Sequence, residues 1–438
     1  MGNRVASSCH PIQLDGGIAS VTSRSSAAQR RGATRLRSGC CRAGIALAAL
    51  LAGALPASAQ GLAEAFERAW ANHPQAGTWD DRAAEAQARA EIATGITPGP
   101  PAVSMSTMDD RLGSDRGRRE LEVELAVPLW LPGQKSAQGE HARAAIEEVS
   151  ARRNALRWQL AGELRQAWWA VAAARNALAL AGRRAASARL LESDVVRRFE
   201  AGDLSRIDAN LARDERIAAE ADQLEAAAGV ARAETVYRVL TGSEAPAALS
   251  EEAAAAESAQ AYGVHPRLEA LEAIARVARA RLAVVEASSR AAPEFAVRVA
   301  RERGDFAEPF GNAVGVKLTI PFAAGPRTRQ LGAAGRAEAA QVEAELARAR
   351  VQARLDEQRA RSDLDAAERQ LAMASQRRTI TTDNLRLAER SFALGESALF
   401  ALLRVRAQAF EAEAFFDRQR IARAAARSRL NQALGVMP

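Results

Sequence analysis

Cysteine is almost absent from this chain of 438 residues. The only three are Cys9, Cys40 and Cys41, so no cysteine follows residue 41. Beyond that point the chain can form neither a disulfide nor a thiolate site for catalysis or metal binding. Aromatic residues are scarce as well, at 4%. A large globular core uses more of them, whereas Ala-rich helices suit thin, closely packed coiled coils.

Net positive charge is nearly absent once one terminal segment is set aside. Residues 1–59 hold seven arginines and a single acid, Asp15, and so carry +6 of the net charge of +7. The rest of the chain is close to neutral. A basic terminal segment therefore explains the charge better than a DNA-binding face does, and we expect no nucleic-acid partner.

Long hydrophobic runs are also missing. The longest apolar stretch, residues 43–55, follows Arg37 and Arg42 and precedes the small residues of PASA, which end at Ala59. Its 13 residues fall short of the roughly 20 that a membrane-spanning helix needs. We interpret residues 1–59 as a signal peptide cleaved after Ala59. The long stretch before the apolar run suggests that translation starts downstream, at Val21, which N-terminal sequencing of the precursor would check.

Catalytic and metal-binding patterns are absent from the sequence. Beyond residue 59 there are three histidines, of which His73 and His265 each precede a proline and are interpreted as turn residues. His141 stands alone in a helical stretch. No HExxH, GxSxG, Walker or Rossmann pattern occurs. We therefore expect no enzyme, no metal site and no cofactor.

What the chain does contain is an internal duplication. A shift of 193 residues aligns residues 123–242 with 316–435 without a gap. Matches at Pro, Phe and Gly are the informative ones in such an Ala-rich chain: Pro128 with Pro321, Phe199 with Phe392, Gly202 with Gly395, and Gly242 with Gly435. We predict a first structural repeat over 61–242, a linker over 243–262 and a second repeat over 263–438.

Each repeat reads as helix, strand, strand, long helix, break and shorter helix. Helices are predicted over 61–96, 136–199, 205–241, 265–292, 329–391 and 398–434, and strands over 101–109, 121–129, 293–301 and 314–322. A helix of about 65 residues is roughly 100 Å long, so it needs partners along its whole length. We expect shorter helices stacked end to end beside each long one.

The predicted strands are apolar on one face. In the second and fourth strands, apolar residues alternate with polar or small ones: Val123, Leu125 and Val127; Val316, Leu318 and Ile320. About nine residues is the length at which a tilted strand crosses a membrane. Membrane β-structure must close into a barrel of about eight strands or more, so four strands require oligomerisation. The alternative is a small soluble β-subdomain that buries this face.

The order of these features resembles one family, the TolC-like outer-membrane efflux proteins. The resemblance covers residues 61–438 and rests on the duplication, on LAEAFERAWANHP, on VELAVPLWLPGQ and VKLTIPFAAGP, and on the two Phe-x-x-Gly breaks. It implies a homotrimer with a 12-stranded outer-membrane barrel, four strands per chain, continued by a long periplasmic α-helical barrel. Such a protein would be the passive exit duct of a tripartite efflux or type I-like export system. Its partners would be a periplasmic adaptor (membrane fusion protein) and an inner-membrane transporter of the RND or ABC type.

The resemblance also implies roles for particular residues. The hairpin tips would dock the adaptor: Phe199, Gly202, Asp203, Leu204, Phe392, Gly395, Glu396 and Ser397. Asp208 and Arg404 would lie at the periplasmic entrance and could pair across the hairpins. The lipid-facing residues would be Val123, Leu125, Val127, Val316, Leu318 and Ile320.

Two rival functions fit the sequence less well. A periplasmic adaptor or coiled-coil scaffold would share the helical hairpins but would have a soluble β-domain and no pore. A soluble exported enzyme would need a catalytic site that the sequence does not contain. Lipid accessibility at Val123, Leu125, Val316 and Leu318 would distinguish the channel from the adaptor.

Overall fold

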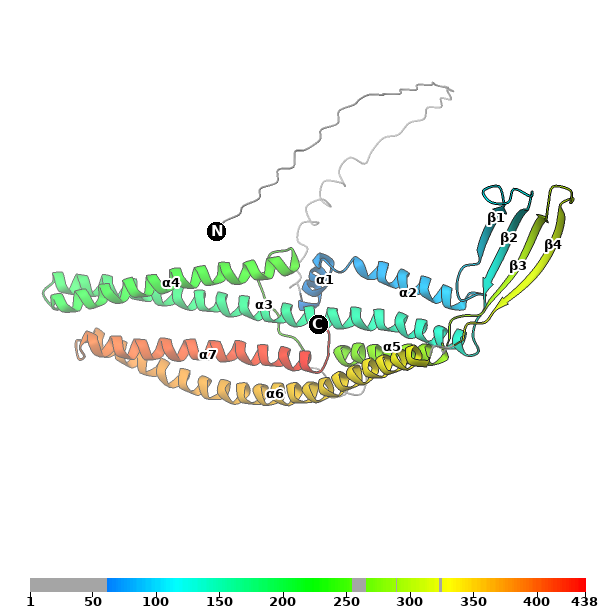
Figure 1. The fold of residues 1–438 in the computed structure, drawn as a ribbon. Coiled ribbons are helices and arrows are strands. Elements are labelled where there is room, and N and C mark those ends of the chain that lie inside the picture. Colours follow the sequence, from blue (N-terminus) through cyan, green and yellow to red (C-terminus); the bar gives the residue numbers. More distant parts are fainter. Residues whose placement is uncertain (1–60, 254–264, 289, 323–324) are drawn as a thin grey trace, which may run out of the picture. The chain divides into compact units, whose positions relative to one another are not determined.

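A computed structural model describes residues 61–253, 265–288, 290–322 and 325–438 (Figure 1). The predicted signal peptide and residues 254–262 of the predicted linker lie outside these ranges. The helices are α1 (Leu62–Asn72), α2 (Thr78–Thr94), α3 (Gln134–Glu200), α4 (Arg206–Thr241), α5 (Pro266–Ala287), α6 (Gly325–Ala393) and α7 (Leu399–Ala433). The strands are β1 (Ala102–Asp109), β2 (Arg119–Pro128), β3 (Glu294–Arg303) and β4 (Gly311–Thr319).

The prediction of one continuous helix over 61–96 was wrong, because α1 ends at Asn72 and α2 begins at Thr78. Pro74 has no N–H and disfavours helical backbone at the residue before it, so the helix stops at His73. The His73 side chain then accepts a hydrogen bond from the Gln75 N–H. The equivalent His265 stands at the other end of a helix. It caps the start of α5 by accepting from the Arg267 N–H, with Pro266 in the first turn.

The four strands form one antiparallel sheet in the order β1-β2-β3-β4. The two repeats meet at the centre of this sheet, where Val123 of β2 pairs with Val299 of β3. Val297 in turn pairs with Val316 of β4, so valines continue across the sheet on one face. The last strand was predicted to reach Phe322, but β4 ends at Thr319, which places Ile320 and Phe322 beyond it.

Each long helix is flanked by two shorter ones, as predicted (Figure 1). Along α3, the α4 helix packs against the C-terminal half, where Arg175 pairs with Glu234 at 2.7 Å. The α2 helix packs against α3 nearer its other end. Along α6, the partners are α7 and α5. The α5 helix also contacts α3, through Arg276 and Glu147, and α7 contacts α3 as well. The two repeats are therefore joined through helices as well as through the sheet.

Most interhelical contacts are made by alanines, which let long helices approach closely. Two of the buried clusters consist of alanine alone: Ala151, Ala270 and Ala273; Ala185, Ala188 and Ala219. Large side chains gather at one level, where α1, α3, α4 and α7 meet. Trp168 is fully buried there against Tyr237, and its indole N–H donates to the Ser250 carbonyl at 3.2 Å. Trp168 and the neighbouring Trp169, which is 9% exposed, therefore serve the packing of the bundle.

A buried ion pair lies beside this aromatic cluster. Arg165 on α3 is 3% exposed, and its guanidinium contacts the Glu252 carboxylate at 2.7 Å. The same guanidinium donates to the Gln432 side chain on α7 and to the Val436 carbonyl. One arginine thus ties the first long helix to the segment after α4 and to the C-terminal helix.

Removal of Arg165 should therefore destabilise the bundle. In Arg165→Ala the Glu252 charge stays buried without its partner, which costs about 3–5 kcal/mol. We expect thermal loss of helical circular dichroism at a clearly lower temperature. The matched control is Arg369→Ala, which breaks an exposed 2.6 Å pair with Asp365 on α6 and should change stability by less than about 1 kcal/mol. Equal effects of the two variants would contradict this account.

Candidate functional site: the sheet and the hairpin turns

The apolar face of the sheet is not covered by any other part of the described chain. Large apolar side chains on β1 to β4 are exposed: Val103, Met105, Leu121, Val123, Leu125, Phe295, Val297, Val299, Val314, Val316 and Leu318. Val127 is half-buried, and Ile320 is exposed just past the end of β4. The soluble alternative requires this face to be buried, yet no helix of the described chain packs on it.

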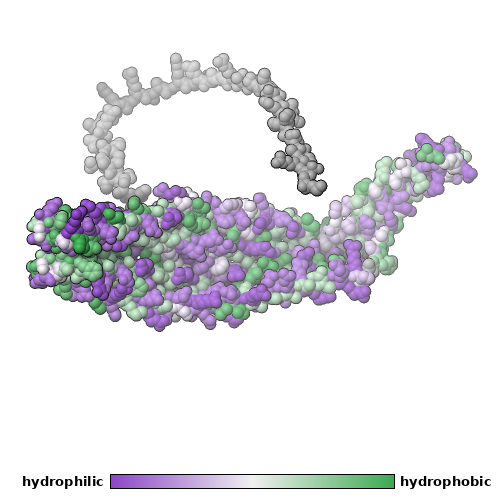
Figure 2. All heavy atoms as spheres, turned by 60° about the vertical axis from the view of Figure 1, so that its left-hand side comes forward, coloured by the Kyte–Doolittle hydropathy of each residue, from purple (hydrophilic) through white to green (hydrophobic). Residues whose placement is uncertain are grey.

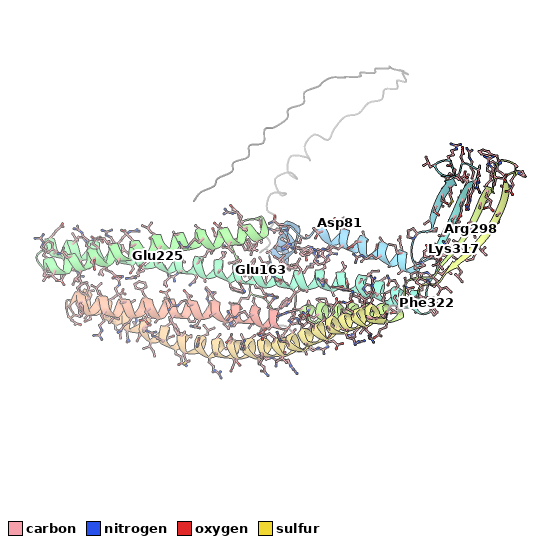
Figure 3. All side chains as sticks on the ribbon, viewed as in Figure 1. Asp81, Glu163, Glu225, Arg298, Lys317 and Phe322 are labelled. Carbon is pink, nitrogen blue, oxygen red and sulfur yellow. The ribbon has the colours of Figure 1, made fainter. Side chains whose placement is uncertain are left out.

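The opposite face of the sheet carries charged residues, of which the two glutamates are sheltered. Glu122 and Glu124 of β2 have side chains only 19% and 15% exposed. Glu122 pairs with Arg298 of β3 at 3.7 Å, and Glu124 pairs with Lys317 of β4 at 3.4 Å. Figure 3 labels Arg298 and Lys317 on neighbouring strands. A sheet with apolar residues outward and paired charges inward suits the wall of a water-filled pore that faces lipid on its other side.

The two helix breaks are the same structural motif. Gly202 and Gly395 both have left-handed backbone, with φ of 87° and 77°. At each break the glycine N–H donates to the carbonyl three residues earlier, and the next N–H donates to the carbonyl five residues earlier. This is the Schellman ending of a helix, in which a side chain at the glycine position would be strained. The predicted helical hairpins are confirmed.

The two turns differ in their surroundings. Phe392 is buried against Leu191, Val195, Ala212, Leu399 and Leu402, so that the second hairpin is fixed to the first. Arg198 of α3 lies over the Phe392 ring at 5.0 Å and donates to its carbonyl oxygen at 3.3 Å. Phe199, its counterpart in the first repeat, is 39% exposed. Sequence reasoning treated the two phenylalanines as equivalent, and the structure gives them different environments.

The remaining tip residues are mostly at the surface. Gly202, Asp203, Gly395 and Glu396 are exposed, whereas Leu204 and Ser397 are half-buried. Leu204 packs on the same apolar cluster as Phe392. The exposed residues of the two turns come together because this cluster holds the two hairpins side by side.

Asp208 has a structural contact of its own. Its carboxylate accepts from the Ser205 N–H at 3.1 Å, while the Ser205 hydroxyl oxygen accepts from the Asp208 N–H. This capping box begins α4. Arg404 on α7 is exposed, and within the described residues no ion pair joins it to Asp208. The structure therefore does not bring these two predicted entrance residues together in one chain.

Arg406 is a residue that the sequence did not single out. Its guanidinium donates to the hydroxyl and carbonyl oxygens of Ser187 on α3. Burial lowers the pKa of Arg406 below its ordinary value, and the nearby Glu389 and Glu215 act in the opposite direction. The internal repeat does not predict this contact, because the equivalent residue of the first repeat, Arg213, is exposed.

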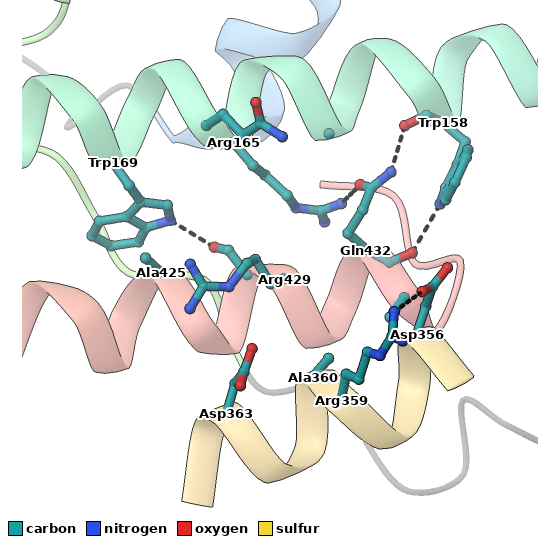
Figure 4. A pocket seen from close by; sticks show the side chains of 14 residues that line it. Trp158, Arg165, Trp169, Asp356, Arg359, Ala360, Asp363, Ala425, Arg429 and Gln432 are labelled. Atoms are coloured by element: carbon teal, nitrogen blue, oxygen red, sulfur yellow. Dashed lines mark hydrogen bonds and ion pairs between the residues drawn. The ribbon is translucent and has the colours of Figure 1, made fainter. Parts of the chain in front are cut away.

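A cleft of about 500 Å³ lies between α3, α6 and α7 (Figure 4). Trp158 and Gln432 exchange two hydrogen bonds across it, at 2.9 and 2.8 Å. The Trp169 indole donates to the Ser428 hydroxyl at 2.8 Å. These polar groups of the lining bond to one another and so connect the helices. Among the described residues, no group of three or more His, Cys, Asp or Glu side chains could hold a metal ion.

The fold is shared with solved outer-membrane channels. The Campylobacter jejuni CmeC outer membrane channel has a TM-score of 0.69 at 13% identity, over 85% of each chain. The Vibrio cholerae outer membrane protein VceC has a TM-score of 0.70 at 15% identity, over 86% of this chain and 96% of its own. The open state of the Neisseria gonorrhoeae MtrE outer membrane channel has a TM-score of 0.67 at 17% identity, over 86% and 89%.

No family profile and no curated protein matches this chain by sequence. The similarity therefore lies in the fold: a mainly helical chain with a four-stranded antiparallel sheet, arranged as in these channels. None of the described helices is long and apolar enough to cross a membrane.

The capping role of Asp208 makes a local prediction. Asp208→Ala removes one half of the capping box and should destabilise the first turn of α4 by about 1 kcal/mol. Amide hydrogen exchange in that turn should then be several-fold faster. Asp203→Ala, which alters an exposed residue of the same turn, is the control and should leave the exchange unchanged. Unaltered protection in Asp208→Ala would contradict the capping role.

Proposed function

We propose that this protein is the passive exit duct of a tripartite efflux or type I-like export system in the outer membrane. The observation that carries the proposal is the sheet, with its apolar face uncovered within the described chain and its charges paired on the other face. The fold common to outer-membrane channels such as CmeC and MtrE supports it. Neither feature favours a periplasmic adaptor, which would bury its β-domain.

The duct would be a homotrimer. Four strands are too few to close a barrel, and three copies of this sheet give twelve. The lumen would then be lined by Glu122, Glu124, Arg298 and Lys317, and the lipid would contact Val123, Leu125, Val127, Val316, Leu318 and Ile320. The helices of the described residues would extend into the periplasm as an α-helical barrel.

Energy and selectivity would come from the partners. The proposed partners are an inner-membrane transporter of the RND or ABC type and a periplasmic adaptor between it and the duct. The adaptor would bind the tips at Phe199, Gly202, Asp203 and Leu204 of the first hairpin. On the second hairpin it would bind Gly395, Glu396 and Ser397, with Phe392 as their buried support.

The entrance would be held shut by Asp208 and Arg404 from neighbouring hairpins. Pairing between chains is consistent with the lack of a contact between them within one described chain. Partial exposure of both residues means that the pair would be worth about 1 kcal/mol or less per contact, repeated around the ring.

The primary test is the native mass of the detergent-extracted protein after the inner and outer membranes have been separated on a density gradient. We expect a trimer of mature chains in the outer-membrane fraction. A periplasmic monomer or dimer would refute the duct and favour the adaptor-like scaffold.

The lipid-facing assignment can be tested within one strand. Val316→Arg places a charge on the apolar face of β4, and near the bilayer midplane this costs roughly 2–4 kcal/mol per chain. We expect much less heat-stable trimer in the outer membrane. Thr319→Arg puts the same charge on the polar face of the same strand and should assemble normally. Equal assembly of both variants would contradict the orientation of the sheet.

The entrance can be tested by single-channel conductance in planar bilayers. Asp208→Asn with Arg404→Gln removes both charges but keeps a side-chain oxygen for the α4 cap. We expect a several-fold higher conductance than in the unaltered protein. The control is Asp383→Asn with Arg386→Gln, which removes an exposed 2.8 Å pair within α6. No difference between the two double variants would rule out the proposed lock.

A further inference from the structure

The helices of one chain form a layer with two open edges. Between the aromatic cluster and the hairpin turns, the helices pack side by side in the order α4, α3, α7 and α6 (Figure 1). The outer sides of α4 and α6 therefore have no helical neighbour in the described chain. Because α3 and α7 lie between them, the outer sides of α4 and α6 cannot meet within one molecule.

The α6 edge carries a row of exposed apolar residues. Met373, Ile380 and Leu387 of α6 and Leu394, the first residue after its end, recur at intervals of seven and are 52–65% exposed. A seven-residue spacing of apolar residues is the pattern by which one helix packs along another. The α7 helix already packs on a different face of α6, where Ala374 is fully buried. We call these four residues the α6 row. Figure 2 shows apolar side chains gathered at the hairpin end.

The α4 edge carries a matching pair. Ile217 and Leu224 are also seven residues apart, and they are 52% and 74% exposed. Ile217 lies 15 residues after Gly202, and Ile380 lies 15 residues before Gly395. Leu224 and Met373 lie 22 residues from the same two glycines. Since the two turns pack side by side, each α4 residue stands at about the same height as its α6 counterpart.

The two edges also differ in charge. Together α2 and α4 contain eleven acidic and seven basic residues, whereas α6 contains ten acidic and thirteen basic residues. Asp81 and Glu225, labelled in Figure 3, are exposed and have no ion-pair partner in the described chain. Arg348 and Arg390 of α6 are likewise exposed and unpaired within the described residues. The net acidic helices at one edge of a molecule are therefore complementary to the net basic helix at the opposite edge of its neighbour.

We propose that neighbouring copies join by a seam between α4 of one chain and α6 of the next, with Ile217 beside Ile380 and Leu224 beside Met373. The proposal rests on the trimeric duct and specifies the surface and register by which it closes. Two different edges make a head-to-tail contact, which closes into a ring when the rotation permits. The helices are antiparallel in this seam, because α4 leads away from its turn and α6 leads towards its own.

Cysteine pairs test the register directly, since the chain has no cysteine after residue 41. At the usual interaxial distance of about 8–10 Å, with Cα atoms about 2.3 Å from each axis, directly facing Cα atoms of two helices are about 3.5–5.5 Å apart, which overlaps the disulfide range. Ile217→Cys with Ile380→Cys, and Leu224→Cys with Met373→Cys, should form disulfides in intact outer membranes. The mismatched control is Leu224→Cys with Leu394→Cys, whose members lie 22 residues and one residue from their turns.

On non-reducing gels we expect most of each matched pair to run as a covalent trimer, and the mismatched pair and the single cysteines to run as monomers. Matched pairs that stay monomeric, in a protein whose native mass is that of a trimer, would overturn the seam and leave the duct intact. A native monomer would refute the duct as well. Covalent dimers without trimer would indicate a face-to-face contact, and a cross-link to a different protein would assign this surface to a partner. Either result would overturn the proposal.

Discussion

The unpaired edges of the sheet are the constraint on which the rest of the structure depends. In the order β1-β2-β3-β4, the outer backbone groups of β1 and β4 have no partner within the described chain. The apolar face that begins at Val103 and continues to Leu318 is likewise uncovered. Water does not satisfy an apolar face, and lipid does not satisfy open backbone groups. Both requirements are met together when several copies of the sheet join edge to edge into a closed barrel in lipid. A single chain leaves both of them unmet.

The long helices, like the sheet, need packing partners along their whole length. A helix of 67 or 69 residues gains little from its own propensity and needs continuous packing. Alanine supplies that packing along most of α3 and α6, because small side chains allow close approach without bulky cores. The large residues are concentrated where α1, α3, α4 and α7 converge. There Trp168 packs against Tyr237 within the first repeat, and Arg165 joins the first repeat to the second through Gln432 and Val436.

The two halves of the chain are similar in sequence, but equivalent residues in them make different contacts. Phe392 is used inside the chain to join the hairpins, and Phe199 is left at the surface. Arg406 is half-buried and donates to Ser187, whereas its counterpart Arg213 is exposed. Asp208 caps a helix, and the matching position holds Ala401. A chain whose two halves differ in this way has two unlike edges, as head-to-tail assembly requires.

The sequence by itself determined the repeat, the order of helices and strands, the glycine turns and the two-faced strands, because these follow from local propensity, spacing and periodicity. It missed the break at His73, where the same His-Pro pair ends one helix and begins another, since the sequence does not show on which side of the pair the helix lies. Only the tertiary structure decided which phenylalanine is buried, that Arg406 links the hairpins, and that Glu122 and Glu124 are paired across strands. Those outcomes depend on which segments, far apart in sequence, come to lie side by side, and local pattern carries no information on that.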